Sequence, residues 1–116
     1  MKKMVIISLV VSLFTLMIAL QSFGGGDVTK GRIVYEAFCI NCHGVTGGGD
    51  GPNAAALNPK PTNLTDKAAT SNLTPQDIER AVVMGKPDTA MKGYGGILTK
   101  EDIEDLFAYL NTLMGK

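Results

Sequence analysis

The sequence is poor in several kinds of residue on which common functional sites depend. Its 116 residues include one histidine, two cysteines and no tryptophan, and 6% of them are aromatic. Basic and acidic residues balance at 11 each, so no excess of positive charge favours nucleic acid as a partner. A zinc site needs about four ligands, and the chain has only these three histidine and cysteine side chains to offer. The sequence therefore argues against a nucleic-acid binder and against a structural zinc site.

The three scarce donors lie together in the segment Cys39-Ile40-Asn41-Cys42-His43. Two cysteines separated by two residues and followed by histidine match the attachment site of a c-type haem. On one helical turn both thiols share a face, where each can form a thioether with one haem vinyl group while the histidine faces the iron. A redox-active dithiol is the alternative for the cysteines, but the chain lacks the βαβ pattern expected around one. We predict one haem c, covalently attached through Cys39 and Cys42, with His43 as an iron ligand.

The first 24 residues have the pattern of an export segment. Two lysines precede the 17 uncharged, mostly apolar residues 4–20, which as a helix would span about 26 Å. This length lies between a signal-peptide core of about 7–15 residues and a bilayer core of about 30 Å. Ser22-Phe23-Gly24 suits cleavage before Gly25, and without cleavage the segment would tether the chain to a membrane. We predict a signal peptide or N-terminal membrane anchor over 1–24, and an extracytoplasmic domain, periplasmic in a bacterium, over 25–116.

Within this domain, the pattern predicts helices separated by a long irregular stretch. Helices are expected over 27–43, over 75–84 and from Thr99 onward, with a short helical turn near 66–70. Gly31 in the first helix costs about 1 kcal/mol relative to alanine, and the close approach of another helix would explain it. The acids at 101, 102, 104 and 105 of the last helix are expected to form a solvated face.

A second iron ligand has to come from a side chain other than histidine. Outside the first 24 residues, the thioether candidates are Met84, Met91 and Met114. Met84 and Met114 fall on predicted helices, where methionine usually packs in a core. Met91 falls in the irregular segment 86–97, which is rich in glycine and can approach a ring closely. We expect Met91 as the second ligand; Met84, or a haem with no strong sixth ligand, remain the alternatives.

Taken in order, these features resemble a class I cytochrome c of the small bacterial monohaem type, over residues 27–114. In that family, a glycine and an aromatic residue of the N-terminal helix meet a leucine and an aromatic residue of the C-terminal helix. Gly31, Tyr35, Leu106 and Tyr109 occupy the matching positions. The resemblance implies an all-α cytochrome c fold, with three to four helices wrapped around one covalently bound haem.

Two further segments resemble family motifs near the iron. Gly51-Pro52 resembles the turn whose proline carbonyl accepts a hydrogen bond from the second nitrogen of the histidine ligand, which implies that Pro52 orients His43. The segment 89–94 resembles the loop that carries the methionine ligand. Many relatives have proline directly after the methionine, whereas Lys92 follows here, which leaves the loop less stiff and places a charge near the haem edge.

The expected ligands imply electron transfer rather than catalysis. With His43 and Met91 both bound, the iron has no open position for a substrate. We expect a monomeric one-electron shuttle between respiratory redox proteins that are exported or membrane-bound, docking through a small, transient interface. Lys60, Lys86 and Lys92 would rim the haem edge, although scattered surface lysines are the simpler account. The alternatives are a haem-bearing subunit of a larger oxidoreductase complex and a haem-based binder of small ligands with a labile sixth site.

Overall fold

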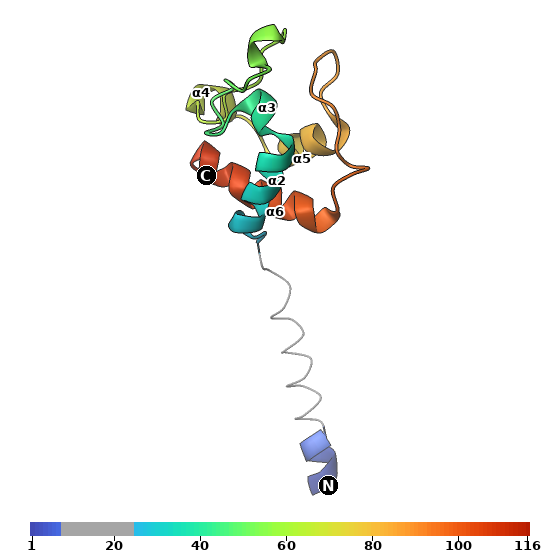
Figure 1. Cartoon of the computed structure of the whole chain (residues 1–116). Coiled ribbons are helices and arrows are strands. Elements are labelled where there is room, and N and C mark those ends of the chain that lie inside the picture. The colour runs from blue at the N-terminus through green and yellow to red at the C-terminus, as the bar shows by residue number, and fades with distance from the viewer. Residues whose placement is uncertain (8–24) are drawn as a thin grey trace.

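The computed structural model describes residues 1–7 and 25–116, and the larger part is a bundle of helices (Figure 1). Within the described residues, the only β pairing is an isolated bridge between Gly85 and Lys92. The all-α class expected from the sequence is therefore confirmed. The helical elements are α2 (Val28–Phe38), α3 (Ile40–His43), the 3₁₀ turn η1 (Ala54–Ala56), α4 (Lys67–Thr70), α5 (Pro75–Met84) and α6 (Lys100–Met114).

Helices α2 and α6 cross at close range in the centre of the domain (Figure 1). A Cβ atom on Gly31 would overlap the main-chain carbonyl oxygen of Asp105 and would lie 3.0 Å from the amide nitrogen of Leu106. Because main chain cannot move aside like a side chain, the crossing requires glycine. Beside it, Tyr35 is fully buried, and its ring packs on that of Tyr109 with 5.2 Å between centroids. The expected contact between these two helices is confirmed.

Helices α5 and α6 begin with the same local arrangement. Thr74 and Thr99 each accept a hydrogen bond from the backbone N–H three residues later, and the aspartate at that position accepts one from the threonine N–H. These capping boxes satisfy amide groups that a helix start otherwise leaves without partners. Both predicted starts are confirmed, as is the end of α5 at Gly85. The two helices contribute most of the core cluster, which consists of Tyr35, Val82, Leu98, Leu106, Leu110 and Met114.

The prediction of one continuous helix over 27–43 is wrong at Cys39. Helix α2 ends at Phe38, α3 begins at Ile40, and Cys39 between them has φ −116°. The amide of Cys42 donates to the carbonyl of Cys39 at 3.3 Å, a contact between residues three apart that tightens the turn. The cysteine motif therefore occupies a short turn of its own rather than the end of a long helix.

The prediction of a solvated acidic face on the last helix is wrong at Asp105. This side chain is 6% exposed, and its carboxylate accepts a hydrogen bond from the backbone N–H of Asp27 at 2.6 Å. Asp27 in turn caps α2 by accepting a hydrogen bond from the amide of Lys30. Asp105 therefore ties the start of α2 to α6, whereas Glu101 and Glu104 of the same helix are exposed.

The predicted helical turn near 66–70 is confirmed as α4, which Asp66 caps. The loop that follows is held by the C-terminal residue of the chain. The Lys116 ammonium donates to the carbonyls of Thr70 and Leu73, each at 2.9 Å. This contact fixes the position of a segment that lines the cavity described below.

The predicted leader lies largely outside the described residues, since 8–24 are not among them. Among residues 1–7 and 25–116, no helix has the length and apolar character needed to cross a bilayer. The segment that leads into α2 runs close to α6. Gly26 approaches α6 so closely that a Cβ atom there would overlap the carbonyl oxygen of Glu104.

Candidate functional site

A cavity of about 440 Å³ is lined by residues of α2, α3, α5 and α6 and by the segments around α4. Three of the predicted haem-site residues, Cys39, His43 and Met91, lie in its wall although they are far apart in the sequence. The rest of the wall is mostly apolar, and it includes Leu64, Leu73, Ile78, Val82, Leu106 and Leu110. The fold thus gathers sulfur and nitrogen donors around a space that excludes most polar groups.

Cys39 and Cys42 are both half-buried and are not paired with each other in a disulfide. Burial raises the pKa of the Cys39 thiol to about 11, and the neighbouring Cys42 adds to the effect. A redox-active dithiol needs the opposite, a cysteine whose pKa is lowered so that a thiolate is present at neutral pH. The environment of Cys39 therefore does not suit the attacking thiolate of a redox-active dithiol. Among the described residues, no cluster of three or more histidine, cysteine, aspartate and glutamate side chains could hold a metal ion.

His43 is held through one ring nitrogen. Its Nδ1 lies 3.1 Å from the carbonyl oxygen of Thr62. Because a carbonyl oxygen only accepts hydrogen bonds, this contact requires a hydrogen on Nδ1, so Nε2 of the neutral ring keeps its lone pair. Burial lowers the pKa of His43 and outweighs the opposing effect of the Thr62 hydrogen bond, so the neutral ring is favoured. A neutral imidazole with a fixed tautomer is the form in which histidine binds a metal.

The predicted role of Pro52 is wrong. The carbonyl that faces Nδ1 of His43 is that of Thr62, and Pro52 is exposed. Gly51 packs against the main chain of α3 so closely that a Cβ atom would overlap it, which keeps the Gly51-Pro52 turn against that helix and away from the ring. Every residue has a main-chain carbonyl, so no side-chain pattern marks Thr62 as the partner. The sequence offered no signal by which it could have been found.

Met91 stands near the end of a tight loop, residues 86–92, which we call the Met91 loop. The amide of Lys86 donates to the carbonyl of Met91 at 3.0 Å. The hydroxyl of Thr89 accepts a hydrogen bond from the amide of Met91 at 3.1 Å and donates to the carbonyl of Lys86 at 2.8 Å. These bonds join the two ends of the loop, and the loop holds the half-buried Met91 in the cavity wall.

The other candidate methionines lie elsewhere. Met84 is 76% exposed at the end of α5, and Met114 is 3% exposed within the core cluster. Neither lines the cavity, whereas Met91 does. The geometry therefore favours Met91 over Met84 as the thioether available to a group bound there.

Charged side chains also reach the cavity wall, namely Arg80, Lys86 and Asp77. Haem is a flat apolar ring with two carboxylates, so an apolar wall that includes two cations suits it. With Cys39 and His43 in the same wall, the residues fit a covalently attached haem. Arg80 was not predicted from the sequence. It could have been found from a projection of α5, because Arg80 and Ala81 follow Asp77 by three and four residues and so lie on the same helix face.

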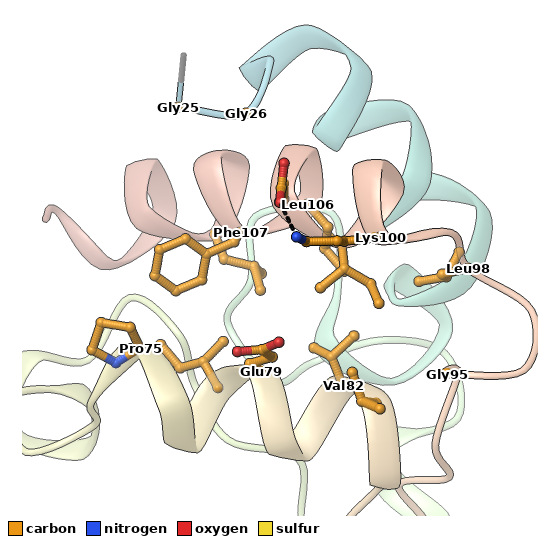
Figure 2. A pocket seen from close by; sticks show the side chains of 15 residues that line it. Gly25, Gly26, Pro75, Glu79, Val82, Gly95, Leu98, Lys100, Leu106 and Phe107 are labelled. Atoms are coloured by element: carbon orange, nitrogen blue, oxygen red, sulfur yellow. Dashed lines mark ion pairs between the residues drawn. The ribbon is translucent and has the colours of Figure 1, made fainter. Parts of the chain in front are cut away.

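A larger hollow of about 750 Å³ lies between α5 and α6 (Figure 2). Its lining includes Phe107, Glu79 and Lys100, and none of the cysteine, histidine or methionine residues in the described part of the chain lines it. Size alone would select this hollow, but it lacks the donors that the chemistry requires. Four side chains line both spaces and so separate them: Ile78, Val82, Leu106 and Leu110.

A Cys-x-x-Cys-His turn beside a cavity that also contains a methionine from a distant loop is the arrangement of a haem protein of the c type. The sequence model of the family described as Cytochrome c matches residues 28–114. This chain belongs to the cytochrome c family. Its cofactor is a covalently attached haem c, and membership supports haem-based electron transfer.

Individual relatives agree with this family. Cytochrome c-554(547) of Halothiobacillus neapolitanus is 30% identical over 90 residues, which are 76% of this chain and 98% of that protein. A chain of the Kuenenia stuttgartiensis reducing HAO-like protein complex Kustc0457/Kustc0458 superposes with a TM-score of 0.67 at 30% identity, covering 79% of this chain and 44% of that one. The KustC0563 c-type cytochrome has the same fold, with a TM-score of 0.56 at 21% identity over 73% of this chain and 94% of that one.

Proposed function

We propose that the protein is a one-electron carrier whose haem is attached at Cys39 and Cys42 and ligated by His43 and Met91. The observation that carries the proposal is that one cavity has Cys39, His43 and Met91 in its wall. The chain has no other histidine, and no other methionine of residues 1–7 and 25–116 lines the cavity. When bound, haem iron supplies a site that gains and loses single electrons. Two protein ligands leave that iron no open position, so electron transfer is favoured over catalysis.

Most of the surrounding residues raise the reduction potential of such a site. The soft thioether of Met91 favours the reduced iron, and an apolar wall disfavours the additional positive charge of the oxidised iron. Arg80 and Lys86 in the same wall add electrostatic repulsion of that charge. The hydrogen bond to Thr62 opposes these effects, because it makes His43 a stronger donor. We expect a reduction potential above that of a bis-histidine haem in an open, polar pocket.

The setting proposed for this carrier follows from the first 24 residues. Residues 1–24 act as a signal peptide or as an N-terminal membrane anchor, and 25–116 form a monomeric electron-transfer domain outside the cytoplasm, in the periplasm of a bacterium. Its partners are respiratory redox proteins that donate and accept single electrons through brief contacts.

The absorption spectrum of the oxidised holoprotein tests the ligand assignment. A sulfur-to-iron charge-transfer band is expected in the wild type and in Met84→Ala, whose thioether is exposed. The band should be lost in Met91→Ala, and exogenous imidazole or cyanide should then bind without the delay imposed by displacing a protein ligand. A band that survives in Met91→Ala would show that another group is the sixth ligand.

A second candidate is an electron-transfer subunit of a larger redox assembly. It is favoured by the likeness to a chain of the Kuenenia stuttgartiensis reducing HAO-like protein complex, of which this chain spans less than half. Purification of the protein at native abundance, followed by light scattering, separates the two. A single haem-bearing species of the domain's own mass supports the free carrier, and stoichiometric co-purification with another polypeptide supports the subunit.

A further inference from the structure

Tyr94, three residues after Met91, is bonded to the ends of two helices. Its amide donates to the carbonyl of Val82 in α5 at 2.8 Å. Its hydroxyl donates to the carbonyl of Phe38, the last residue of α2, at 3.3 Å. Burial raises the pKa of this hydroxyl, which therefore stays protonated and remains a donor at neutral pH. Tyr94 thus connects the chain that leaves the Met91 loop to both helices.

The side chain of Tyr94 also packs on that of Phe38. The two rings meet edge to face, with 5.6 Å between centroids and 60° between planes. Lys92, in the Met91 loop, places its ammonium 5.6 Å from the centroid of the Tyr94 ring. Edge-to-face rings and a cation over a ring are both favourable arrangements beyond simple burial.

The position of this Phe38–Tyr94 pair relates it to the cavity. Phe38 immediately precedes Cys39, which is in the cavity wall, and Tyr94 closely follows Met91, which is in the wall as well. Phe38 is 38% exposed and lies outside the core cluster. Tyr94 is half-buried and packs against that cluster. The contacts of the pair join the segment that carries the attachment cysteines to the segment that carries the methionine.

Gly93 fixes the direction from which Tyr94 reaches Phe38. A Cβ atom on Gly93 would lie 2.5 Å from the carbonyl oxygen of Val83 and 2.7 Å from the carbonyl carbon of Met84. The chain after the Met91 loop therefore runs directly against the end of α5, at a distance that only glycine permits. With the main chain anchored there, the aromatic contact is the side-chain link from this segment to α2.

We propose that the Phe38–Tyr94 pair keeps the Met91 loop closed on the cavity and so keeps Met91 on the iron. The proposal rests on the function proposed above, in which Met91 is the sixth ligand. Tyr94 and Phe38 are then positioning residues. Neither residue lines the cavity, and they act on how often the loop opens.

Imidazole binding to the oxidised holoprotein measures this opening, because imidazole reaches the iron only when Met91 has left. At low imidazole concentration, the rate of binding is proportional to the fraction of protein in the open state. Tyr94→Leu and Phe38→Leu are each expected to raise that rate about 2- to 12-fold, the range that corresponds to the stabilising free energy of an aromatic pair. Tyr94→Phe keeps the ring and should raise the rate less. This variant replaces Tyr94→Leu in the test if the leucine variant folds poorly.

A matched control and a double variant separate loop closure from general loosening. Phe107 points into the hollow between α5 and α6 (Figure 2), and no residue of the Met91 loop lines that hollow. Phe107→Leu therefore makes the same truncation and should leave the rate unchanged. The double variant Phe38→Leu with Tyr94→Leu should bind imidazole about as fast as Tyr94→Leu alone, because the contact between the rings can be lost only once. Rates that multiply in the double variant, or that rise equally in Phe107→Leu, would overturn the proposal.

Hydrogen exchange at the Lys86 amide, which is bonded to the carbonyl of Met91, tests loop closure independently of the iron ligand. Tyr94→Leu should speed this exchange relative to Phe107→Leu. A wild-type protein without the sulfur-to-iron band would refute Met91 as the ligand, and unchanged exchange in Tyr94→Leu would refute the closing role of the aromatic pair. The two failures are therefore distinguishable.

Discussion

Replacement of Gly31 by alanine is the sharpest test of how the domain is held together. The added Cβ atom would overlap the carbonyl oxygen of Asp105 and would lie 2.5 Å from its carbonyl carbon, well inside ordinary contact. Because the obstacle is the main chain of α6, the two helices must move apart. The nearby Tyr35 and Leu106, 0% and 1% exposed, would then lose close packing.

The magnitude follows from two opposing effects. Overpacking a tight contact costs about 1–3 kcal/mol, and the upper end applies here because no side chain can yield. Alanine is a better helix former than glycine by about 1 kcal/mol, which offsets part of this cost. The net expectation is a loss of about 2 kcal/mol in the free energy of unfolding, or a melting temperature lower by about 8–16 °C for a domain of this size.

Guanidinium and thermal unfolding of the holoprotein, followed by far-UV circular dichroism, measure this loss. Gly96→Ala is the matched control, since a Cβ atom there has nothing within 4 Å, and its stability should change by less than about 0.5 kcal/mol. If Gly31→Ala were as stable as the wild type, or more stable as helix propensity alone predicts, the close crossing of α2 and α6 would be refuted.

Three further predictions use the same unfolding assay. Tyr35→Phe removes a buried hydroxyl that donates to the carbonyl of Gly44 at 2.6 Å, and it should lower the free energy of unfolding by about 1–2 kcal/mol; unchanged stability would contradict a buried bond there. Thr99→Ala removes the cap of α6 and should cost about 1 kcal/mol, whereas no loss would mean that the capping box is not formed in solution. The threonine hydroxyls and amides that bond Asp77 and Asp102 lower the pKa of both carboxyl groups in the folded state. The two carboxylates therefore stabilise the folded protein fully above the ordinary aspartate pKa of about 3.9, and this stabilisation is lost as the pH falls through their lower pKa values in the folded state. Stability measured from pH 6 to pH 2 should therefore fall less steeply in Asp102→Asn than in the wild type, and equal slopes would contradict this cause.

The parts of the fold that could be predicted are those whose cause is local in sequence. The start of α5 depends on a threonine, a proline and an aspartate within four positions, and the attachment site of the haem on five consecutive residues. The cofactor followed from the second of these, and the class of fold followed from the resemblance of the motifs, in their order, to the cytochrome c family. Gly31 was informative for a different reason: an unfavourable residue in a helix requires a tertiary cause, and the crossing with α6 provides it.

The parts that could not be predicted depend on contacts between distant main-chain groups. Thr62 orients His43 through its main-chain carbonyl, a group that every residue contains. The motif Gly51-Pro52 therefore led to the wrong residue being predicted as the partner of His43. Asp105 has the periodicity of a surface acid, and its burial depends on the amide of Asp27 at the start of another helix. In both cases the partner is a backbone group that the fold brings near, and the pattern of side chains in the sequence does not indicate such a contact.

The central claim, that Cys39 and Cys42 hold the haem covalently, is tested most directly by the intact mass of the purified holoprotein under denaturing conditions. Haem bound only by coordination or packing is lost under those conditions, whereas thioether-bound haem remains. The account predicts one species with the mass of the polypeptide plus one haem. The double variant Cys39→Ser with Cys42→Ser should have the mass of the polypeptide alone. A wild-type mass equal to that of the polypeptide alone, with two thiols that react with an alkylating reagent, would contradict it.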